Sequence, residues 1–198
     1  RGWMEGTAGN LSTRVDGDRA LITASGLSKG ELTPDDVVLV DAATGRPVDP
    51  DGRRPSAETC IHAALYRVFP DCGAVVHAHC PYATAVSATA ARAGSWSVRF
   101  AGFEIIKGFG LADPGQVTVP VFRNWADVPR IADDVARHYA RPGARPDARP
   151  GADPAPVFLI EHHGATAWGP TLEIARNRLE CLEALCRLHL LTSPKDHP

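Results

Sequence analysis

The sequence predicts a mixed α/β fold, and three observations support this prediction. Short apolar runs rich in β-branched residues alternate with longer runs whose apolar residues recur at helical spacing. The short runs end in Gly, Ser, Asp or Thr, which favour turns. Hydrophobic residues make up 44% and charged residues 22% of the 198 positions, as in a globular protein. We therefore expect one layered α/β domain over residues 1–198.

The individual elements can be placed in chain order. β-Branched and apolar runs predict strands over residues 20–23, 37–40, 73–79, 117–122 and 157–160. Apolar residues at helical spacing predict four helices: one with Ser56 as its N-cap, one whose first turn contains Pro81, one around residues 131–139 and one over about 171–191.

One segment fits neither pattern. Residues 141–156 contain five prolines and two glycines in 16 positions, so they can form neither a helix nor a sheet ladder. Too few residues follow this segment for a second independent core. We interpret 141–156 as a mobile surface loop within the single domain.

The charge and cysteine content exclude some classes of partner. With 21 Lys+Arg against 23 Asp+Glu, the net charge is −2, and no basic stripe indicates nucleic acid or a membrane surface as a partner. No apolar run is long enough to span a bilayer. The five cysteines include no C-x-x-C pair, which favours a reducing, cytoplasmic compartment.

Histidines follow two of the predicted strands. His77 and His79 are two residues apart at a strand end, so their side chains project to the same face. His162 and His163, followed by Gly164, end a later strand. Histidine is the commonest ligand of zinc, and catalytic zinc sites use three protein ligands. The pattern predicts a metal site, with buried structural histidines as the alternative.

Two carboxylates are candidates for an acid/base role. Glu58 lies in the first turn of a predicted helix, where a carboxylate is also favoured for purely structural reasons. Glu104 is a single carboxylate in an apolar segment, and such surroundings raise a carboxyl pKa toward neutrality. A salt-bridged structural glutamate is the alternative for Glu104.

Three loops of small residues, 6–10, 23–26 and 55–56, could hold a phosphate through backbone N–H groups and hydroxyls. Each loop taken singly is an ordinary turn.

The order of these motifs resembles the class II aldolase/adducin family over essentially the whole chain. The motifs are Gly6-Thr7-Ala8-Gly9-Asn10, Ser25-Gly26, Pro55-Ser56-Ala57-Glu58, Val76-His77-Ala78-His79 and His163-Gly164. The resemblance implies a three-layer α/β/α domain around a mostly antiparallel sheet. It also implies a homotetramer with active sites near subunit interfaces, and a first helix upstream of Gly2 that this sequence lacks.

The resemblance also implies roles for particular residues. It implies that His77, His79 and His163 bind one Zn²⁺ per subunit, and that Glu104 is the catalytic acid/base. Four residues match the phosphate-binding loops of the family: Asn10, Ser25, Gly26 and Ser56. Glu58 matches the carboxylate that aldolases of the family use as their base.

The segments around Glu104 and after His163 are similar to those of dehydratases in this family. They imply zinc-dependent loss of water from a small sugar phosphate, 5-methylthioribulose 1-phosphate, in methionine salvage. Phe100, Phe103 and Trp168 are then candidates for an apolar pocket around the methylthio group, with a place in the core as the alternative. The alternatives are a sugar-phosphate aldolase or 4-epimerase that uses Glu58 as its base, and a non-catalytic adducin-like scaffold.

Overall fold

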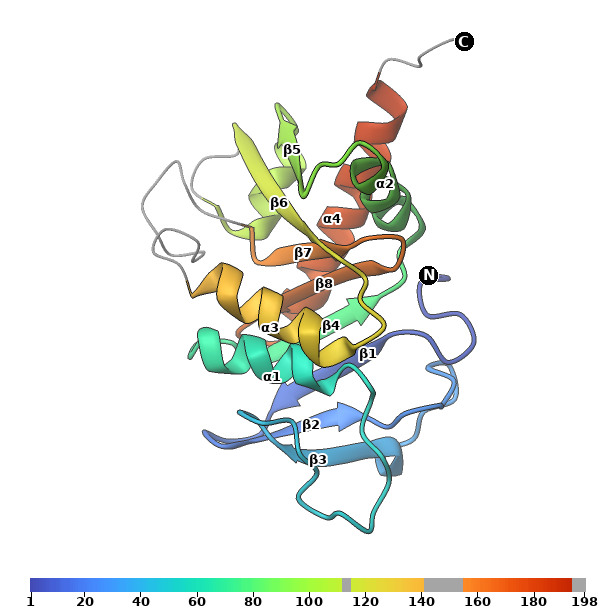
Figure 1. The fold of residues 1–198 in the computed structure, drawn as a ribbon, viewed down its shortest axis with the longest axis vertical. Coiled ribbons are helices and arrows are strands. Elements are labelled where there is room, and N and C mark those ends of the chain that lie inside the picture. Colours follow the sequence, from blue (N-terminus) through green and yellow to red (C-terminus); the bar gives the residue numbers. More distant parts are fainter. Residues whose placement is uncertain (112–114, 141–154, 194–198) are drawn as a thin grey trace.

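The computed structural model describes residues 1–111, 115–140 and 155–193, which form one sheet with helices on both faces (Figure 1). The strands are β1 (Asn10–Arg14), β2 (Arg19–Thr23), β3 (Val37–Asp41), β4 (Ala74–Ala78), β5 (Ser97–Ala101), β6 (Gln116–Phe122), β7 (Val157–Ile160) and β8 (Gly164–Gly169). The helices are α1 (Thr59–Val68), α2 (Pro81–Arg92), α3 (Val128–Tyr139) and α4 (Leu172–Thr192), with short 3₁₀ helices η1 (Pro34–Asp36) and η2 (Glu104–Phe109).

The sheet has eight strands in the order β3-β2-β1-β4-β8-β7-β6-β5. Every neighbouring pair is antiparallel except β6 and β7, which confirms the expected mostly antiparallel sheet. Strand β4 lies between β1 and β8, with Asn10 opposite His77 on one side and Thr166 opposite His77 on the other. The middle of the sheet is therefore where residues from three motifs meet.

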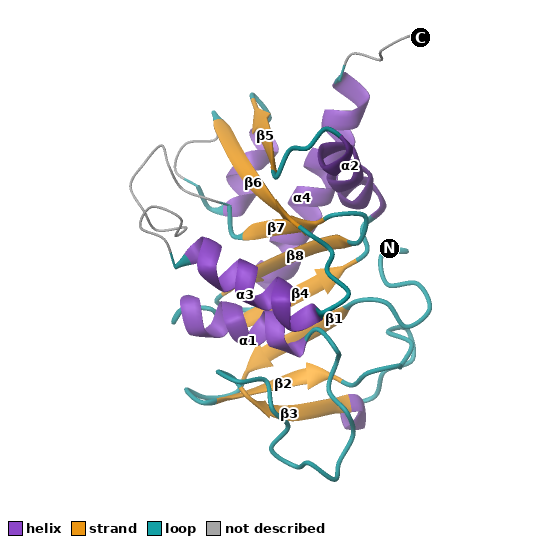
Figure 2. Ribbon diagram, viewed as in Figure 1, coloured by secondary structure: helices purple, strands orange, loops and turns teal. Residues whose placement is uncertain are grey.

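Apolar side chains fill both faces of the sheet. One core contains Ile61, Leu65, Ile131 and Tyr139 from α1 and α3, and the other contains Val86, Leu179 and Leu182 from α2 and α4. Figure 2 shows the two helical layers with the sheet between them. The three-layer α/β/α architecture is confirmed. All five residues of β4 are buried, because both of its faces are covered, and this explains its continuous apolar run.

The predicted strands and helices are all present, but α1 begins later than expected. Thr59 is its first residue and Glu58 occupies the N-cap position, so the prediction of Ser56 as N-cap is wrong. Instead Ser56 closes the preceding turn: its hydroxyl accepts the Glu58 N–H at 3.3 Å, and its carbonyl accepts the Thr59 N–H at 3.1 Å.

A distant carboxylate caps the helix that follows the histidine strand. Pro81 is the first residue of α2, as predicted, and the N–H groups of Tyr82 and Ala83 donate to Glu183 of α4 at 3.0 and 2.8 Å. Glu183 is buried. The free N–H groups at the start of α2 are thus satisfied by a side chain on the last helix.

Most of the proline-rich segment, residues 141–154, lies outside the described residues, so its prediction as a mobile loop stays a prediction. Among the helices that are described, none has the length and hydropathy needed to cross a bilayer.

Candidate active site

Three histidines converge at one end of the central strands. His77 belongs to β4, His79 follows it, and His163 lies in the turn between β7 and β8. One ring nitrogen from each lies within 4.8 Å of the other two. The ring centroids are 4.5 to 5.3 Å apart. The predicted convergence is therefore confirmed, and it comes from the pairing of β4 with β8.

The turn before β8 explains why His163, and not its neighbour, joins this group. A Cβ atom on Gly164 would lie 2.4 Å from the Ala78 carbonyl oxygen, so only glycine lets the turn approach the end of β4. His162 has a positive φ of 53° and its side chain is exposed. The chain reverses at His162, which turns His163 toward His77 and His79.

Burial keeps His77 in the form that binds metals. It lowers the pKa of His77 to about 4, so the imidazole is neutral near pH 7. The Nδ1 atom lies 3.0 Å from the Thr166 hydroxyl, which can hold the tautomer with hydrogen on Nδ1. The Nε2 atom is buried and has no hydrogen-bond partner among the described residues. Its lone pair is thus directed into the histidine group.

Thr166 is a residue that the sequence reasoning missed. It lies on β8 directly opposite His77, and although it belongs to the segment after His163 that carries the resemblance, no role was predicted for it. The signal that could have found it is the register of the sheet, which a single sequence does not give.

Glu58 lies against the same histidines. Its carboxylate oxygens are 3.4 Å from His77 Nε2 and 3.5 Å from His163 Nε2, and the Asn10 amide donates to it at 2.6 Å. Burial acts to raise the pKa of Glu58, but His77, His163 and Asn10 outweigh it, so the pKa lies below its usual value. Glu58 is therefore a carboxylate that lies beside the imidazoles of His77 and His163, with its pKa lowered.

This donor set fits a metal ion. Three imidazole nitrogens with a fourth position left open are the ligand set of catalytic zinc sites, and nitrogen ligands also accept other divalent transition metals. The buried Nε2 of His77, which has no hydrogen-bond partner within the described part of the chain, is the kind of atom that a metal would satisfy.

The predicted phosphate loops lie at the same end of the sheet. The Ser25 N–H donates to the Arg54 carbonyl at 3.0 Å, and the Ser56 N–H donates to the Thr23 carbonyl at 3.2 Å, so the loops carrying Ser25, Gly26 and Ser56 are paired. Asn10 reaches them through Glu58, whose N–H donates to the Ser56 hydroxyl. The structure brings these four residues toward the histidines.

Lys29 is a second residue that the sequence reasoning missed. Its ammonium donates to the carbonyls of Thr7 and Leu27, both at 2.8 Å, and so ties the first loop to the second. After burial and His163, its positive charge contributes to lowering the pKa of His79. A partly buried cation therefore lies near the histidine group, where we expected backbone N–H groups and polar side chains without a lysine.

Glu104 does not have the surroundings that the sequence indicated. Its side chain is 80% exposed, and its carboxylate pairs with Lys107 of the same 3₁₀ helix at 2.6 Å. The prediction of an apolar environment is wrong, because η2 buries Ile106 and Phe109 and turns Glu104 outward. No hydrogen bond or ion pair between described residues links Glu104 to the three histidines.

Of the two roles considered for the aromatic candidates, methylthio pocket or core, the structure favours the core for two of them. Phe100 and Trp168 are buried in the two cores, so in this chain they are packing residues. Phe103 is partly buried against the core that includes α4.

Comparison with known proteins agrees with this architecture. Residues 1–190 match the family model of the class II aldolase and adducin N-terminal domain, and the chain belongs to this family. Among curated proteins it is 42% identical to a methylthioribulose-1-phosphate dehydratase of Microcystis aeruginosa over 189 residues, which covers 94% of this chain and 86% of that protein.

A longer relative and a solved structure extend the comparison. The chain is 50% identical, over 97% of its length, to a Nocardia farcinica protein whose name joins methylthioribose-1-phosphate isomerase to methylthioribulose-1-phosphate dehydratase; it spans 33% of that protein. The structure of L-fuculose-1-phosphate aldolase from Thermus thermophilus is 27% identical with a TM-score of 0.69, covering 96% of this chain and 85% of the other.

Proposed function

We propose that this chain is a lyase that removes water from 5-methylthioribulose 1-phosphate and forms 2,3-diketo-5-methylthiopentyl 1-phosphate, a step of methionine salvage in the cytoplasm. The observation that carries the proposal is the convergence of His77, His79 and His163 beside paired small-residue loops. The 42% identity to a dehydratase of similar length supports the choice of substrate.

For the metal we propose Zn²⁺, one per subunit, held by the three histidines. A zinc ion held by these histidines would supply Lewis-acid chemistry for the substrate carbonyl at C2. The chain's own contribution is the burial of His77 and its orientation by Thr166.

For the phosphate we propose the loops of Ser25, Gly26 and Ser56, with Asn10 at their edge and Lys29 as the nearby cation. Lys29 already uses two donors on backbone carbonyls, which fixes its ammonium in place. Lys29→Met should raise KM about tenfold or more, because a charge-assisted hydrogen bond to the phosphate is lost. Lys29→Arg keeps the positive charge, so its KM should rise less. Steady-state kinetics check this, and an unchanged KM in Lys29→Met would contradict the role.

For the acid/base we propose Glu104, acting on the substrate of an adjacent subunit in a homotetramer. It takes the proton from C3 and delivers a proton to the hydroxyl that leaves C4. The Glu104 side chain is 80% exposed among the described residues, and the contact with a neighbouring subunit would bury it.

The surface next to Glu104 supports this assembly. Ile105 lines an open apolar groove of about 840 Å³ together with Trp3, Tyr82, Leu188 and Leu191. Tyr82, Leu188 and Leu191 are exposed in the single chain. Large apolar side chains gathered in one groove are typical of a surface that another subunit covers.

Mixed oligomers test the assignment of Glu104 directly. Glu104→Gln and His77→Ala subunits should each be inactive alone. Co-expressed hybrids should regain activity, since a site with intact histidines then meets an intact Glu104. Hybrids as inactive as their parents would show that Glu104 does not act across an interface.

A second candidate is a sugar-phosphate aldolase or 4-epimerase with Glu58 as its base. The contacts of Glu58 with His77 and His163 favour it, because this carboxylate lies at the site within one chain. The likeness to L-fuculose-1-phosphate aldolase is consistent with this reading.

Substrate tests separate these functions. The zinc-loaded protein is incubated with 5-methylthioribulose 1-phosphate, L-fuculose 1-phosphate or ribulose 5-phosphate, and the products are identified by NMR and mass spectrometry. Loss of water from the first substrate supports the dehydratase. Cleavage or epimerisation of the others supports the second candidate, and a purified protein that binds no metal would favour the adducin-like scaffold.

A further inference from the structure

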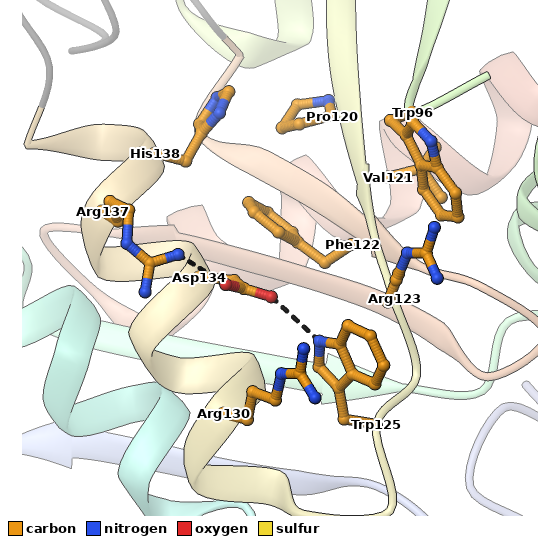
Figure 3. Close-up of a pocket in the computed structure, with 10 residues that line it drawn as sticks. All are labelled: Trp96, Pro120, Val121, Phe122, Arg123, Trp125, Arg130, Asp134, Arg137 and His138. Carbon is orange, nitrogen blue, oxygen red and sulfur yellow. Dashed lines mark hydrogen bonds and ion pairs between the residues drawn. The ribbon is translucent and has the colours of Figure 1, made fainter. Parts of the chain in front are cut away.

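A pocket on the α1/α3 side of the sheet contains three arginines and two tryptophans and shares no residue with the histidine group. It lies between α3, the end of β6 and the residue before β5, and it has a volume of about 360 Å³. We call it the arginine–tryptophan pocket, defined by Trp96, Arg123, Trp125, Arg130, Asp134 and Arg137 (Figure 3). A volume of this size suits a small ligand.

The charges of this pocket are not balanced. Asp134 accepts hydrogen bonds from the Trp125 indole at 2.9 Å and from Arg137 at 2.7 Å, so Arg137 neutralises it. Arg123 and Arg130 form no ion pair with any carboxylate of the described residues. The three arginines and one aspartate leave two positive charges uncompensated, which matches the charge of a phosphate dianion.

Stacking holds the two unpaired guanidinium groups in place. The Arg123 guanidinium carbon lies 4.5 Å from the centre of the Trp96 ring and 5.4 Å from that of Trp125, and the Arg130 carbon lies 3.5 Å from Trp125. Stacking on an indole occupies the face of a guanidinium and leaves its N–H edge available. Less rotamer entropy is then lost when an anion binds.

The floor of the pocket is apolar. Pro120, Val121 and Phe122 of β6 line it, and Figure 3 shows Phe122 between the Asp134 side and the Arg123 side. Trp96 is 41% exposed, so part of its ring is available to an organic group. The pocket thus offers N–H donors for an anion and apolar surface for what is attached to it.

We propose that the arginine–tryptophan pocket is a second anion site, which binds a phosphate group, free or esterified to a small organic molecule, through the guanidinium edges of Arg123 and Arg130. Paired N–H donors of arginine match phosphate oxygens in geometry and charge. The site is separate from the proposed substrate site and does not depend on the proposed reaction.

The test uses the indole N–H signals of the full-length protein in NMR. The chain has four tryptophans, and replacing each by Phe assigns its signal. Inorganic phosphate and phenyl phosphate are titrated separately at constant ionic strength. We expect saturable shifts of the Trp96 and Trp125 signals. Tighter binding of phenyl phosphate identifies an organic ester as the ligand type, and equal binding identifies inorganic phosphate.

Two internal controls separate this pocket from the histidine site and from unfolding. The Trp3 carbonyl accepts the His79 N–H at 2.9 Å, so Trp3 reports on the histidine end, and Trp168 is buried in the core. Shifts of Trp3 alone would overturn the proposal. An unchanged Trp168 signal in a variant shows that its core is intact.

Variants complete the test. The double variant Arg123→Gln/Arg130→Gln should weaken binding of phenyl phosphate at least about tenfold, since two charge-assisted interactions are lost. Arg176→Gln, an exposed arginine of α4, is the matched control and should leave binding unchanged. Saturable shifts that persist in the double variant, or that chloride alone produces, would overturn the proposal.

Discussion

Glu58 and Glu104 lie in two regions that differ in what holds the side chain. Glu58 is fixed by Asn10 of β1, His77 of β4 and His163 of the β7–β8 turn. Glu104 is the exposed first residue of the 3₁₀ helix η2, and among the described residues its carboxylate forms an ion pair only with Lys107. One carboxylate is positioned by the register of the sheet, and the other is presented to the outside.

One chain therefore brings the three histidines together with Glu58, but it does not bring Glu104 to them among the described residues. An exposed carboxylate keeps its ordinary solvation, whereas proton transfer near neutral pH benefits from a less polar environment. A subunit interface would supply that environment for Glu104.

The largest effect is expected from loss of a histidine. His163→Ala should abolish bound metal and reduce turnover by at least about 100-fold, because a three-ligand site loses one ligand. His162→Ala is the matched control, since its side chain is exposed outside the group. Elemental analysis and turnover measure both, and full metal occupancy in His163→Ala would exclude it as a ligand.

The two carboxylates are compared next. Glu104→Gln should keep metal and fold but lose about 100-fold or more in turnover, the scale of a general base. Glu58→Gln should act differently, by changing the charge beside the histidines and thus metal affinity. If Glu104→Gln turns over normally while Glu58→Gln does not, the proton transfer belongs to Glu58.

Removal of the hydroxyl behind His77 should have a smaller effect. Thr166→Val keeps the shape but loses the partner of His77 Nδ1, and metal affinity should fall by about 10- to 100-fold. Thr166→Ser should restore most of it. Competition with a chelating dye gives the metal affinities. Equal affinities of the Thr166→Val variant and the unchanged protein would show that the hydroxyl does not orient His77.

The smallest effect on activity is expected at His62. Its ring is buried, with Nδ1 2.7 Å from the Ser12 hydroxyl, and burial, followed by His77, lowers its pKa to about 3. An unfolded histidine titrates near 6.5, so the unfolded chain binds the extra proton. The contribution of neutral His62 to the free energy of unfolding is therefore fully present above pH 6.5 and is lost as the pH falls toward 3.

Within this pH range the free energy of unfolding falls by about 1.4 kcal/mol per pH unit because of His62. His62→Gln should flatten this part of the profile for metal-free protein. Urea unfolding between pH 7 and 4 measures the difference between the two proteins. Parallel profiles would contradict a neutral buried His62.

Much of the fold follows from the sequence because buried strands and amphipathic helices leave clear patterns. β4 and α4 are examples, since β4 is a short continuous run of buried residues and the buried residues of α4 recur at helical spacing. β1, β5 and β8 were not predicted. β1 and β8 consist mostly of polar or small residues, and β5 has only two large apolar residues, Val98 and Phe100, so none of them forms a continuous apolar run, and pairing with neighbours makes them strands.

The candidate site shows the same limit. His77, His79 and His163 could be found because strand ends and a His-Gly turn are visible in one sequence. Thr166 and Lys29 could not, because one depends on strand register and the other on the packing of two loops. The surroundings of Glu104 were misjudged, since local apolar composition does not tell which residue of a 3₁₀ helix faces outward.

The cap that Glu183 provides has a consequence for the order of folding. Helix α2 begins two residues after His79, and its first N–H groups are satisfied by a residue about one hundred positions later. Such a contact forms only after a long loop has closed. We therefore expect a nascent chain that ends before α4 to leave the start of α2 frayed, so that His79 reaches its final place only when the last helix docks.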